Sequence, residues 1–230
     1  MHPWLECGKF LRICRNNFRT TGAILPSSRF LARALVKQLE DLRPPARILE
    51  VGPGSGSVTV EIARRMHPGD RLDAVEINRR FVDLLAQRVA KEAVFRPVRD
   101  QIEIVHAALQ DLPGESVYDY IVSGLPLNNF TVELVREIFA AYRRLLKPGG
   151  VLTYYEYVLV RQLKSPFVGR RERRRLFRVG RVVGNYIHDY QIRRERIFIN
   201  VPPATVRHLR LKPFVVVRPS EVLKEQTVGK

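Results

Sequence analysis

The sequence contains only two cysteines, Cys7 and Cys14, among its 230 residues. Two cysteines cannot build a disulfide framework, and they fit a reducing compartment. No apolar run approaches the roughly 20 residues that a membrane-spanning helix needs, because the stretch 151–160 is short and is interrupted by Glu156. The first ten residues carry Glu6 and lack the apolar stretch of a secretory signal peptide. These absences exclude a disulfide-stabilised miniprotein and a helical membrane span, and they predict a cytoplasmic protein.

The sequence also lacks a recognisable set of metal ligands. Its five histidines are scattered, and no Cys/His cluster has ligand spacing, so no metal site is predicted. Hydrophobic residues make up 45% of the chain and charged residues 27%. These shares are ordinary for a globular protein and exclude a disordered chain. The length suits one domain with additional segments at its ends.

Acidic residues are scarce at both ends of the chain. The net charge is +17, of which residues 1–40 carry +5, residues 161–196 carry +9 and residues 197–230 carry +4, whereas residues 41–160 carry −1. A neutral body with basic flanks indicates a polyanionic partner, either a membrane surface or a nucleic acid. A GC-rich genome that inflates the arginine content is the alternative, but base composition would not spare the centre of the chain.

Strand and helix signals alternate along the centre of the sequence. Apolar runs bounded by breakers predict strands at 47–51, 72–76, 102–105, 119–123 and 151–160. Helical periodicity predicts helices at 57–66, 78–92 and 130–146, the second with Phe81, Leu84, Leu85 and Val89 on one face. Residues 196–201 and 205–211 flank two prolines and are expected to pair as antiparallel strands. The alternation predicts an α/β fold with a mostly parallel, doubly wound sheet covered on both faces.

These elements define the expected domain organisation. Residues 1–40 are expected to form amphipathic and lead-in helices, and residues 41–211 the main domain. A basic connection at about 161–196 is expected between the fifth and sixth strands, and residues 212–230 form a tail.

A glycine-rich loop follows the first predicted strand. Gly52, Gly54 and Gly56 lie at a strand-to-helix turn, where glycine permits unusual dihedrals and a close approach of a ligand. Glu76 closes the next strand, 24 residues after Gly52, and a carboxylate there can accept both hydroxyls of a ribose. The spacing after Glu50 differs from the G-x-G-x-x-G pattern of NAD-type sites. A tight turn without a ligand is the other interpretation.

The segment Glu50-Val-Gly-Pro-Gly-Ser-Gly56 resembles motif I of the class I S-adenosylmethionine-dependent methyltransferases. The resemblance implies a Rossmann-like sheet of seven strands with the last antiparallel, and S-adenosylmethionine as the cofactor. The family usually has an Asp near the adenine where this sequence has Ala108, and Asp111 is an alternative for that role. The cofactor-binding residues that the resemblance implies are Glu50, Gly52, Pro53, Gly54, Gly56, Glu76, Ile77, Ala108, Leu109 and Ser123.

The methyl acceptor is expected to meet the segment after the fourth strand, Ser123-Gly-Leu-Pro-Leu-Asn-Asn-Phe130. Enzymes that methylate base amines usually carry Asn or Asp, then Pro, then an aromatic residue, and Ser123-Gly-Leu-Pro-Leu127 offers neither the amide nor the aromatic. Glu50-Val-Gly-Pro-Gly54 and the basic flanks are nevertheless similar to ribosomal RNA adenine dimethyltransferases. RNA adenine N-methylation is therefore the alternative function, with nucleic acid as the less favoured partner. A binding module with a vestigial cofactor loop is a third hypothesis, against which the intact glycines argue.

A second resemblance covers residues 19–204. Arg19-Thr-Thr-Gly-Ala-Ile-Leu-Pro-Ser-Ser28, Ser123-Gly-Leu-Pro-Leu127 with Asn129-Phe130, and Asn200-Val-Pro-Pro-Ala204 are together similar to bacterial phospholipid N-methyltransferases. That family methylates the amine of phosphatidylethanolamine, and close relatives methylate that of ornithine lipids. Asn128 and the Arg-rich segment 170–181 depart from the pattern. Ser27 or Ser28 also suits a helix N-cap, and Pro202-Pro203 suits a plain turn.

Two segments are candidates for contact with an anionic membrane. Residues 4–19 project onto a helix with Trp4 on an apolar side and basic residues opposite, which suits a membrane interface or the protein's own core. Residues 170–181 interleave arginine with apolar residues, and each basic residue near such a bilayer contributes about 1 kcal/mol. We therefore expect a peripheral protein on the inner face of the cytoplasmic membrane that acts on an aminolipid. The sequence does not specify the head group, the number of methyl groups or the oligomeric state.

The implied reaction is an in-line attack of a neutral amine on a sulfonium methyl group. An alkylamine with a pKa of about 10 must first lose its proton. The candidate bases are Tyr154 and the predicted catalytic residues His106, Tyr155 and Glu156. Strand alternation places Tyr155 and Tyr157 on one face, and Tyr154 and Glu156 on the other.

Aromatic faces accommodate the quaternary ammonium that repeated methylation builds. Phe130, Tyr155 or Tyr157, and Tyr186 or Tyr190 are candidates for such a box, and core packing is the alternative for each of them. The predicted substrate-binding residues are Ser27, Ser28, Gly124, Leu125, Pro126, Asn129, Phe130, Tyr157 and Tyr186.

Overall fold

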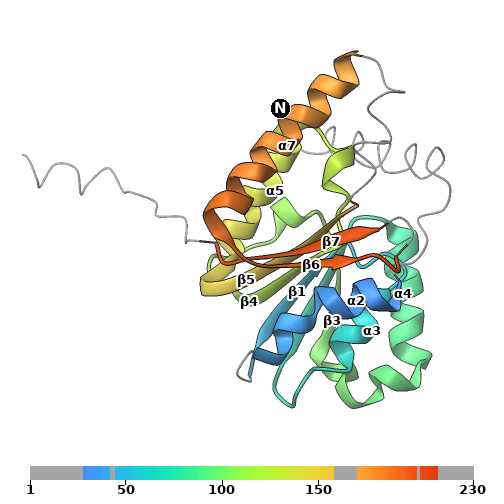
Figure 1. Cartoon of the computed structure of the whole chain (residues 1–230). Helices are drawn as coiled ribbons and strands as arrows, with labels where there is room; N and C mark the ends of the chain where they lie inside the picture. Colours follow the sequence, from blue (N-terminus) through green and yellow to red (C-terminus); the bar gives the residue numbers. More distant parts are fainter. Residues whose placement is uncertain (1–27, 42–44, 158–169, 201–202, 212–230) are drawn as a thin grey trace, which may run out of the picture.

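Seven strands form one sheet in the order β3-β2-β1-β4-β5-β7-β6 (Figure 1). The structure, a computed structural model, describes residues 28–41, 45–157, 170–200 and 203–211. Strands β1 to β5 run parallel, and β7 pairs antiparallel with both β5 and β6. This confirms the predicted α/β fold, with a mostly parallel sheet of seven strands of which the last is antiparallel. The strands are β1 (Arg47–Val51), β2 (Arg71–Glu76), β3 (Ile102–His106), β4 (Tyr118–Ser123), β5 (Leu146–Tyr157), β6 (Gln191–Ile197) and β7 (Ala204–Leu209).

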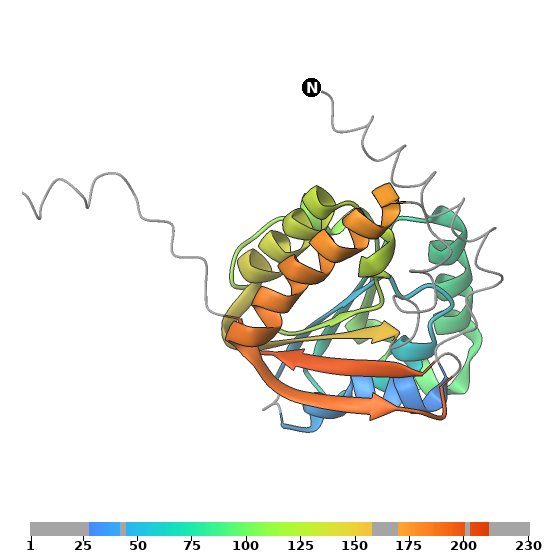
Figure 2. The same ribbon diagram turned by 45° about the horizontal axis from the view of Figure 1, so that its top comes forward.

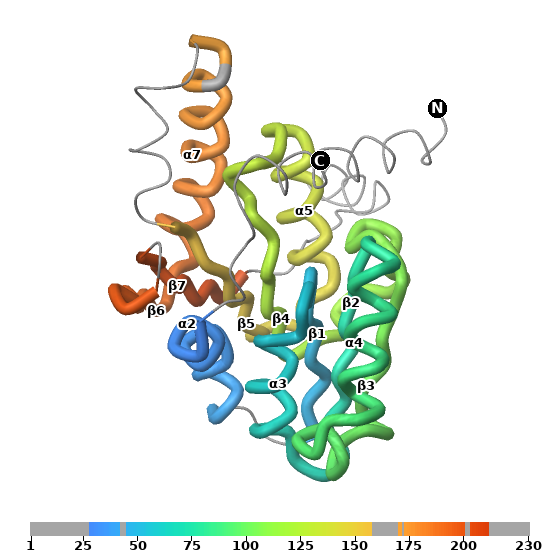
Figure 3. Tube along the Cα trace, turned by 90° about the vertical axis from the view of Figure 1, so that its right-hand side faces the viewer, coloured from blue at the N-terminus to red at the C-terminus, as the bar shows by residue number. Residues whose placement is uncertain are grey.

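Helices cover both faces of this sheet. Figures 2 and 3 show α5 and α7 side by side on one face, with α2 and α3 on the other. The α-helices are α2 (Arg29–Leu35), α3 (Ser57–Ala63), α4 (Arg79–Lys91), α5 (Val132–Leu145) and α7 (Arg170–Tyr190). Short 3₁₀ segments are η1 (Lys37–Asp41), η2 (Ala93–Gln101), η3 (Leu109–Asp111) and η4 (Leu127–Asn129).

Three helices begin at a side-chain cap. The Ser28 Oγ accepts from the backbone N–H of Leu31 at the start of α2. Asn78 and Thr131 cap α4 and α5 in the same way. Such a cap satisfies one of the N–H groups that a helix start leaves without an intrahelical partner, and it stabilises by about 1 kcal/mol. The cap at Thr131 places the start of α5 two residues later than predicted.

The core lies in layers on either side of the sheet. Phe139 and Tyr142 of α5 are buried with Val179 and Val183 of α7 against the face that carries Tyr154. On the other face, α2 and α3 bury Leu31, Leu35, Val58 and Ile62 in the cluster that includes Tyr155. A fully buried aliphatic or aromatic side chain contributes about 1.5–3 kcal/mol. This packing holds the ends of β1, β4 and β5 in fixed positions.

Several expectations about the elements were wrong in detail. Leu84 is 40% exposed, because Leu85 and Val89 form the buried stripe of α4 and Leu84 is rotated about 100° from Leu85 on the helix. The helix expected at 57–66 ends at Ala63. The basic connection at 161–196 contains a 21-residue helix, α7, and β6, which begins five residues before the predicted strand.

Some predictions concern residues outside the described ranges. These are the amphipathic helix at 4–19, Ser27, the end of the fifth strand at 158–160, Pro202 and the tail 212–230. Within the ranges that are described, no helix has the length and apolar character to cross a membrane. The same ranges contain no group of three His, Cys, Asp or Glu residues that could hold a metal ion.

Candidate active site

The glycine loop connects β1 to α3 at the carboxyl ends of the parallel strands. Gly52, Gly54 and Gly56 all have positive φ angles, of 70°, 55° and 81°, a region that favours glycine. A Cβ atom on Gly56 would lie 2.7 Å from the Cδ1 atom of Leu85. The loop therefore requires glycine both for its backbone shape and for the close packing of α4 beneath it.

Glu76 bonds directly to this loop. Its Oε2 accepts from the N–H of Gly54 at 3.2 Å, and its Oε1 accepts from the N–H of Asn78 at 2.8 Å. Burial raises the pKa of Glu76, and the backbone hydrogen bonds offset part of that rise. A carboxylate at the end of β2, held by main-chain donors, keeps acceptor capacity for the two hydroxyls of a ribose.

Glu50 is the most isolated carboxylate of the site. It is 2% exposed, and its Oε2 has no hydrogen-bond partner among the described residues. Burial raises the pKa of Glu50 to about 8, the charge of Glu76 adds to the rise, and Thr59 offsets part of it. A buried polar atom without a partner is costly. The ammonium group of an amino-acid ligand such as the methionine part of S-adenosylmethionine would supply that partner.

Two arginines that the motifs do not include support the site. Arg88 of α4 donates to the carbonyl oxygen of Ser55 in the glycine loop. Arg175 of α7 donates to the carbonyl oxygens of Phe130 and of Asn128, the latter at 2.9 Å. Arginines reaching across to backbone carbonyls leave no local sequence pattern, and for this reason sequence analysis did not find them.

The segment after β4 lies against the glycine loop. The Gly124 N–H donates to the carbonyl oxygen of Val51 at 2.8 Å. A Cβ atom on Gly124 would lie 2.6 Å from the carbonyl oxygen of Gly52. A Cβ atom on Gly52 would lie 3.0 Å from the side chain of Leu125. The cofactor loop and the predicted acceptor segment are thus in backbone contact.

The hydroxyl of Ser123 holds the start of this segment through two hydrogen bonds. Ser123 is fully buried, and its Oγ accepts from Tyr142 Oη at 2.6 Å and from the N–H of Leu125 at 3.3 Å. Its side chain is therefore used within the protein. Phe130 is 1% exposed and packs in the core, with its carbonyl oxygen bound by Arg175. Pro126 and Asn129 are half-buried at η4.

The acceptor segment packs on the face of β5 that carries Tyr154. Tyr154 belongs to the same buried cluster as Leu127 and Phe130, whereas Tyr155 and Tyr157 pack with the α2 side. The alternation predicted for β5 is therefore confirmed. Tyr155 and Tyr157 contact each other edge-on, with ring centroids 5.2 Å apart.

Two ionisable groups accompany Tyr154 on its face. Glu156 Oε2 accepts from Arg207 Nε at 3.0 Å. The hydroxyl of Tyr154 is buried and has no hydrogen-bond partner among the described residues. Burial raises the pKa of the Tyr154 hydroxyl well above its usual value, so this hydroxyl stays protonated and can donate or accept a hydrogen bond.

Other predicted residues lie apart from this group. His106 ends β3, which β2 and β1 separate from β4, and its Nε2 lies 3.1 Å from the carbonyl oxygen of Ile77. Ala108 and the buried Leu109 follow at η3 on the same nucleotide side. Tyr186, in contrast, stacks on Phe139, with ring centroids 4.2 Å apart, and packs against the cluster that contains Phe130.

Two motif segments that are 172 residues apart meet. The Ser28 N–H donates to Asn200 Oδ1 at 3.3 Å, and Asn200 is 4% exposed. Ser28 thus caps α2 with its side chain and binds the Asn200 segment with its backbone. Part of the similarity between separated motifs therefore reflects one structural contact.

Comparisons with known proteins agree with this geometry. Residues 48–150 match the family described as a methyltransferase domain. The O-methyltransferase of Bacillus cereus in complex with S-adenosylhomocysteine shares the fold, with a TM-score of 0.58, 15% sequence identity, and coverage of 89% of this chain and 90% of that chain. The chain belongs to the class I S-adenosylmethionine-dependent methyltransferases, and S-adenosylmethionine is its cofactor.

Two relatives differ in how much of the chain they match. An ornithine lipid N-methyltransferase from Singulisphaera acidiphila is 31% identical over 176 residues, which are 76% of this chain and 84% of the relative. Ribosomal RNA small subunit methyltransferase A from Geobacter metallireducens is 34% identical over 102 residues, which are 41% of this chain and 34% of the relative.

Proposed function

We propose that this methyltransferase N-methylates the amine of a membrane aminolipid, either an ornithine lipid or phosphatidylethanolamine. The observation that carries the proposal is the similarity to an ornithine lipid N-methyltransferase over 76% of this chain and 84% of the relative. The ribosomal RNA methyltransferase A relative matches only 41% of this chain. The lipid relative thus covers much of the acceptor side as well as the cofactor side.

The acceptor segment supports a lipid over a nucleic-acid base. Gly124 and Leu125 present apolar groups beside the glycine loop, and the two side-chain amides of the segment, Asn128 and Asn129, follow later, at η4. An adenine amine needs a hydrogen-bond acceptor and a stacking partner, and Phe130 is buried in the core rather than available for stacking. RNA adenine methylation is the alternative that this segment disfavours.

In the proposed reaction, the cofactor supplies a methyl group on a sulfonium, and the protein positions the amine in line with it. Once S-adenosylmethionine is bound, the lone pair of the amine nitrogen would form the new bond to the methyl carbon, and the carbon–sulfur electrons would remain on sulfur. Holding the reacting atoms in line supplies much of the rate enhancement. We assign this positioning to the contact of Gly124 with Gly52 and to the Tyr154 hydroxyl, which has no partner in the described part of the chain.

The proton of the substrate ammonium needs an acceptor. We propose Glu156, because it lies on the face of the acceptor segment and is 22% exposed in its side chain. Arg207 holds the Glu156 carboxylate in place through an ion pair at 3.0 Å. Burial raises the pKa of Tyr155, which makes it a hydrogen-bond donor rather than a base, and His106 sits on the nucleotide side.

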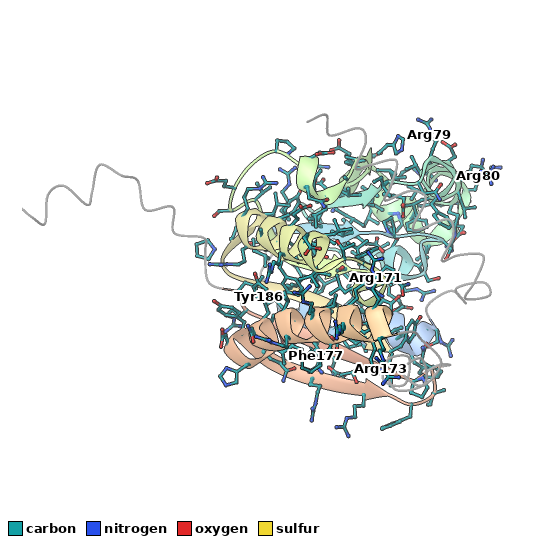
Figure 4. The ribbon with its side chains drawn as sticks, turned by 90° about the horizontal axis from the view of Figure 1, so that it is seen from above. Arg79, Arg80, Arg171, Arg173, Phe177 and Tyr186 are labelled. Carbon is teal, nitrogen blue, oxygen red and sulfur yellow. The ribbon has the colours of Figure 1, made fainter. Side chains whose placement is uncertain are left out.

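The basic segment 170–181 is the first half of α7, and we propose that it contacts anionic lipid. Arg171, Arg173, Arg174 and Arg178 are exposed, and Figure 4 shows Arg171, Arg173 and Phe177 on this half of the helix. Arg175 ties the same half to the acceptor segment. Binding of the helix at the inner face of the membrane would therefore place the acceptor segment next to the lipid head groups.

Methyl transfer to purified acceptors tests the proposal. Full-length protein, labelled S-adenosylmethionine and detergent-dispersed ornithine lipid or phosphatidylethanolamine should give labelled lipid, and ribosomal RNA should stay unlabelled. The Glu76→Ala variant is the control, since loss of the ribose acid should abolish labelling while the protein stays folded. Labelled RNA together with unlabelled lipid would contradict the proposal.

A further inference from the structure

The turn between β6 and β7 exposes two large apolar side chains. Phe198 is 69% exposed and Ile199 is 71% exposed, more than any other large hydrophobic residue of the described chain. Single exposed apolar residues are normal on a protein surface. An adjacent aromatic and aliphatic pair at the tip of a hairpin is a different arrangement, because the tip carries both side chains outward together.

The residues on either side of Phe198 and Ile199 pack against the protein. Ile197 is partly buried against the cluster under α2. Asn200 is 4% exposed, and its side chain accepts from the backbone of Ser28. The protein therefore fixes the neighbours of Phe198 and Ile199 on both sides and leaves these two side chains exposed.

The tip also projects beyond the sheet toward the side on which the site opens. Strand β4 ends at Ser123, which pairs with Tyr154 of β5. Strand β6 ends at Ile197, which lies level with Tyr157 of β5, because both pair with Ala204 of β7. The end of β6 therefore lies three residues, or roughly 10 Å at about 3.3 Å per residue, beyond the end of β4. The first turns of α7 and the β6–β7 turn extend toward the same side in Figure 2.

The strand that leads to the tip is basic. Arg193, Arg194 and Arg196 of β6 are exposed. Charged residues on an edge strand also discourage edge-to-edge pairing, so the arginines alone identify no partner. That role gives no reason for exposing Phe198 and Ile199, whereas a partner that is negatively charged at its surface and apolar just beneath it fits both features.

We propose that the β6–β7 turn inserts Phe198 and Ile199 into the interface of an anionic bilayer, with the arginines of β6 and α7 at the lipid phosphates. The occupant of this surface is the membrane itself. The proposal rests on the proposed function, which it extends by adding a second membrane contact. Together with α7, this contact sets the orientation in which the acceptor segment faces the bilayer.

The experiment measures partitioning of the full-length protein onto vesicles made of equal parts phosphatidylglycerol and phosphatidylcholine. The double variant Phe198→Ser/Ile199→Ser should bind at least about tenfold more weakly, because it would no longer remove these two apolar side chains from water at the bilayer interface. The matched control is Ile192→Ser, which removes an apolar side chain that is 43% exposed on the same strand but away from the tip, and it should bind like the wild type.

A third variant tests the same insertion by a gain of signal. Phe198→Trp should keep its vesicle affinity and shift its fluorescence to the blue when vesicles are added, with quenching by brominated lipid. Unchanged binding by the double variant would overturn the proposal, and so would a change in oligomeric state in place of a change in vesicle binding.

Transfer to detergent-dispersed aminolipid separates this proposal from the proposed function. The double variant should keep that activity and lose activity on vesicles. If the wild type binds vesicles through the tip but methylates no aminolipid, the proposed function fails and the membrane contact stands.

Discussion

Replacing Glu50 by Gln tests whether a buried carboxylate is retained for the cofactor at the expense of stability. The pKa of Glu50 rises from its ordinary value of 4.5 to about 8 in the folded protein, mainly through burial. The folded state therefore holds the proton more tightly than the unfolded state. The stability contributed by this group is complete below about pH 4.5 and is lost as the pH rises through about 8.

The size of the effect follows from these two pKa values. At pH 7 an unfolded Glu is ionised while the folded Glu50 is mostly protonated, and the difference costs about 3 kcal/mol of folding free energy, rising to about 5 kcal/mol at pH 9. Gln carries no such cost. The Glu50→Gln variant without cofactor should therefore melt about 6–12 °C higher than the wild type at pH 7, with a larger difference at pH 9.

Cofactor binding should change in the opposite direction. Loss of a charge-assisted hydrogen bond to the methionine ammonium removes about 1.5–3 kcal/mol, a roughly 10- to 100-fold weaker affinity for S-adenosylmethionine by calorimetry.

The control for this variant is Glu61→Gln. Glu61 is also buried, and its burial alone would raise its pKa, but Arg65 and Arg64 lower it. That variant should lose stability at neutral pH and keep its cofactor affinity. Equal cofactor affinity in Glu50→Gln and the wild type, or a melting temperature that does not rise with the substitution, would refute the reasoning.

Three further predictions follow from named contacts. Gly124→Ala should lower turnover about 100-fold, because the added Cβ would lie 2.6 Å from the carbonyl oxygen of Gly52 and would push the acceptor segment out of line. The control Gly184→Ala should leave turnover unchanged, since no atom lies within 4 Å of its added Cβ. Burial lowers the pKa of His208 to about 4, so urea unfolding should show up to about 3 kcal/mol of stability lost between pH 6.5 and 4, a loss that His208→Gln should reduce. Tyr154→Phe should raise KM for the aminolipid and leave S-adenosylmethionine affinity unchanged; equal KM values would show that the hydroxyl does not contact the substrate.

Local signals in the sequence predicted the strands and their order along the chain. Breakers such as Pro44-Pro45 mark where a strand begins. The alternation of side chains along a strand such as β5 indicates which of them share a face. Tyr154 and Tyr155 were correctly assigned to opposite faces. The choice of face for the acceptor segment required the packing of α5, which involves residues far apart in the sequence.

The helix α7 carries a buried apolar stripe within a strongly basic segment. Its arginines dominate the segment, yet Leu176, Val179 and Val183 are buried at spacings of three and four residues, the period of a helix. The apolar spacing of this segment therefore predicts a helix, while its basic composition indicates an anionic partner.

In the site, the cofactor side was the more predictable half. Positive φ at three glycines and an acid at the end of β2 follow from a local motif. The contacts of Arg88 with Ser55 and of Arg175 with Asn128 could not be predicted, because a long guanidinium group that binds a backbone carbonyl imposes no requirement on the sequence around that carbonyl.

The position of β6 at the border of the sheet bears on how densely copies can gather. A border strand offers unpaired backbone groups to any neighbour, and the proposed binding to a membrane surface would raise the frequency of such encounters. When two copies approach through β6, the exposed Arg194 and Arg196 of each are brought near one another, whereas Arg193 is ion-paired with Glu195. Their mutual repulsion opposes the growth of a shared sheet, so many molecules can work next to each other without fusing into an insoluble layer.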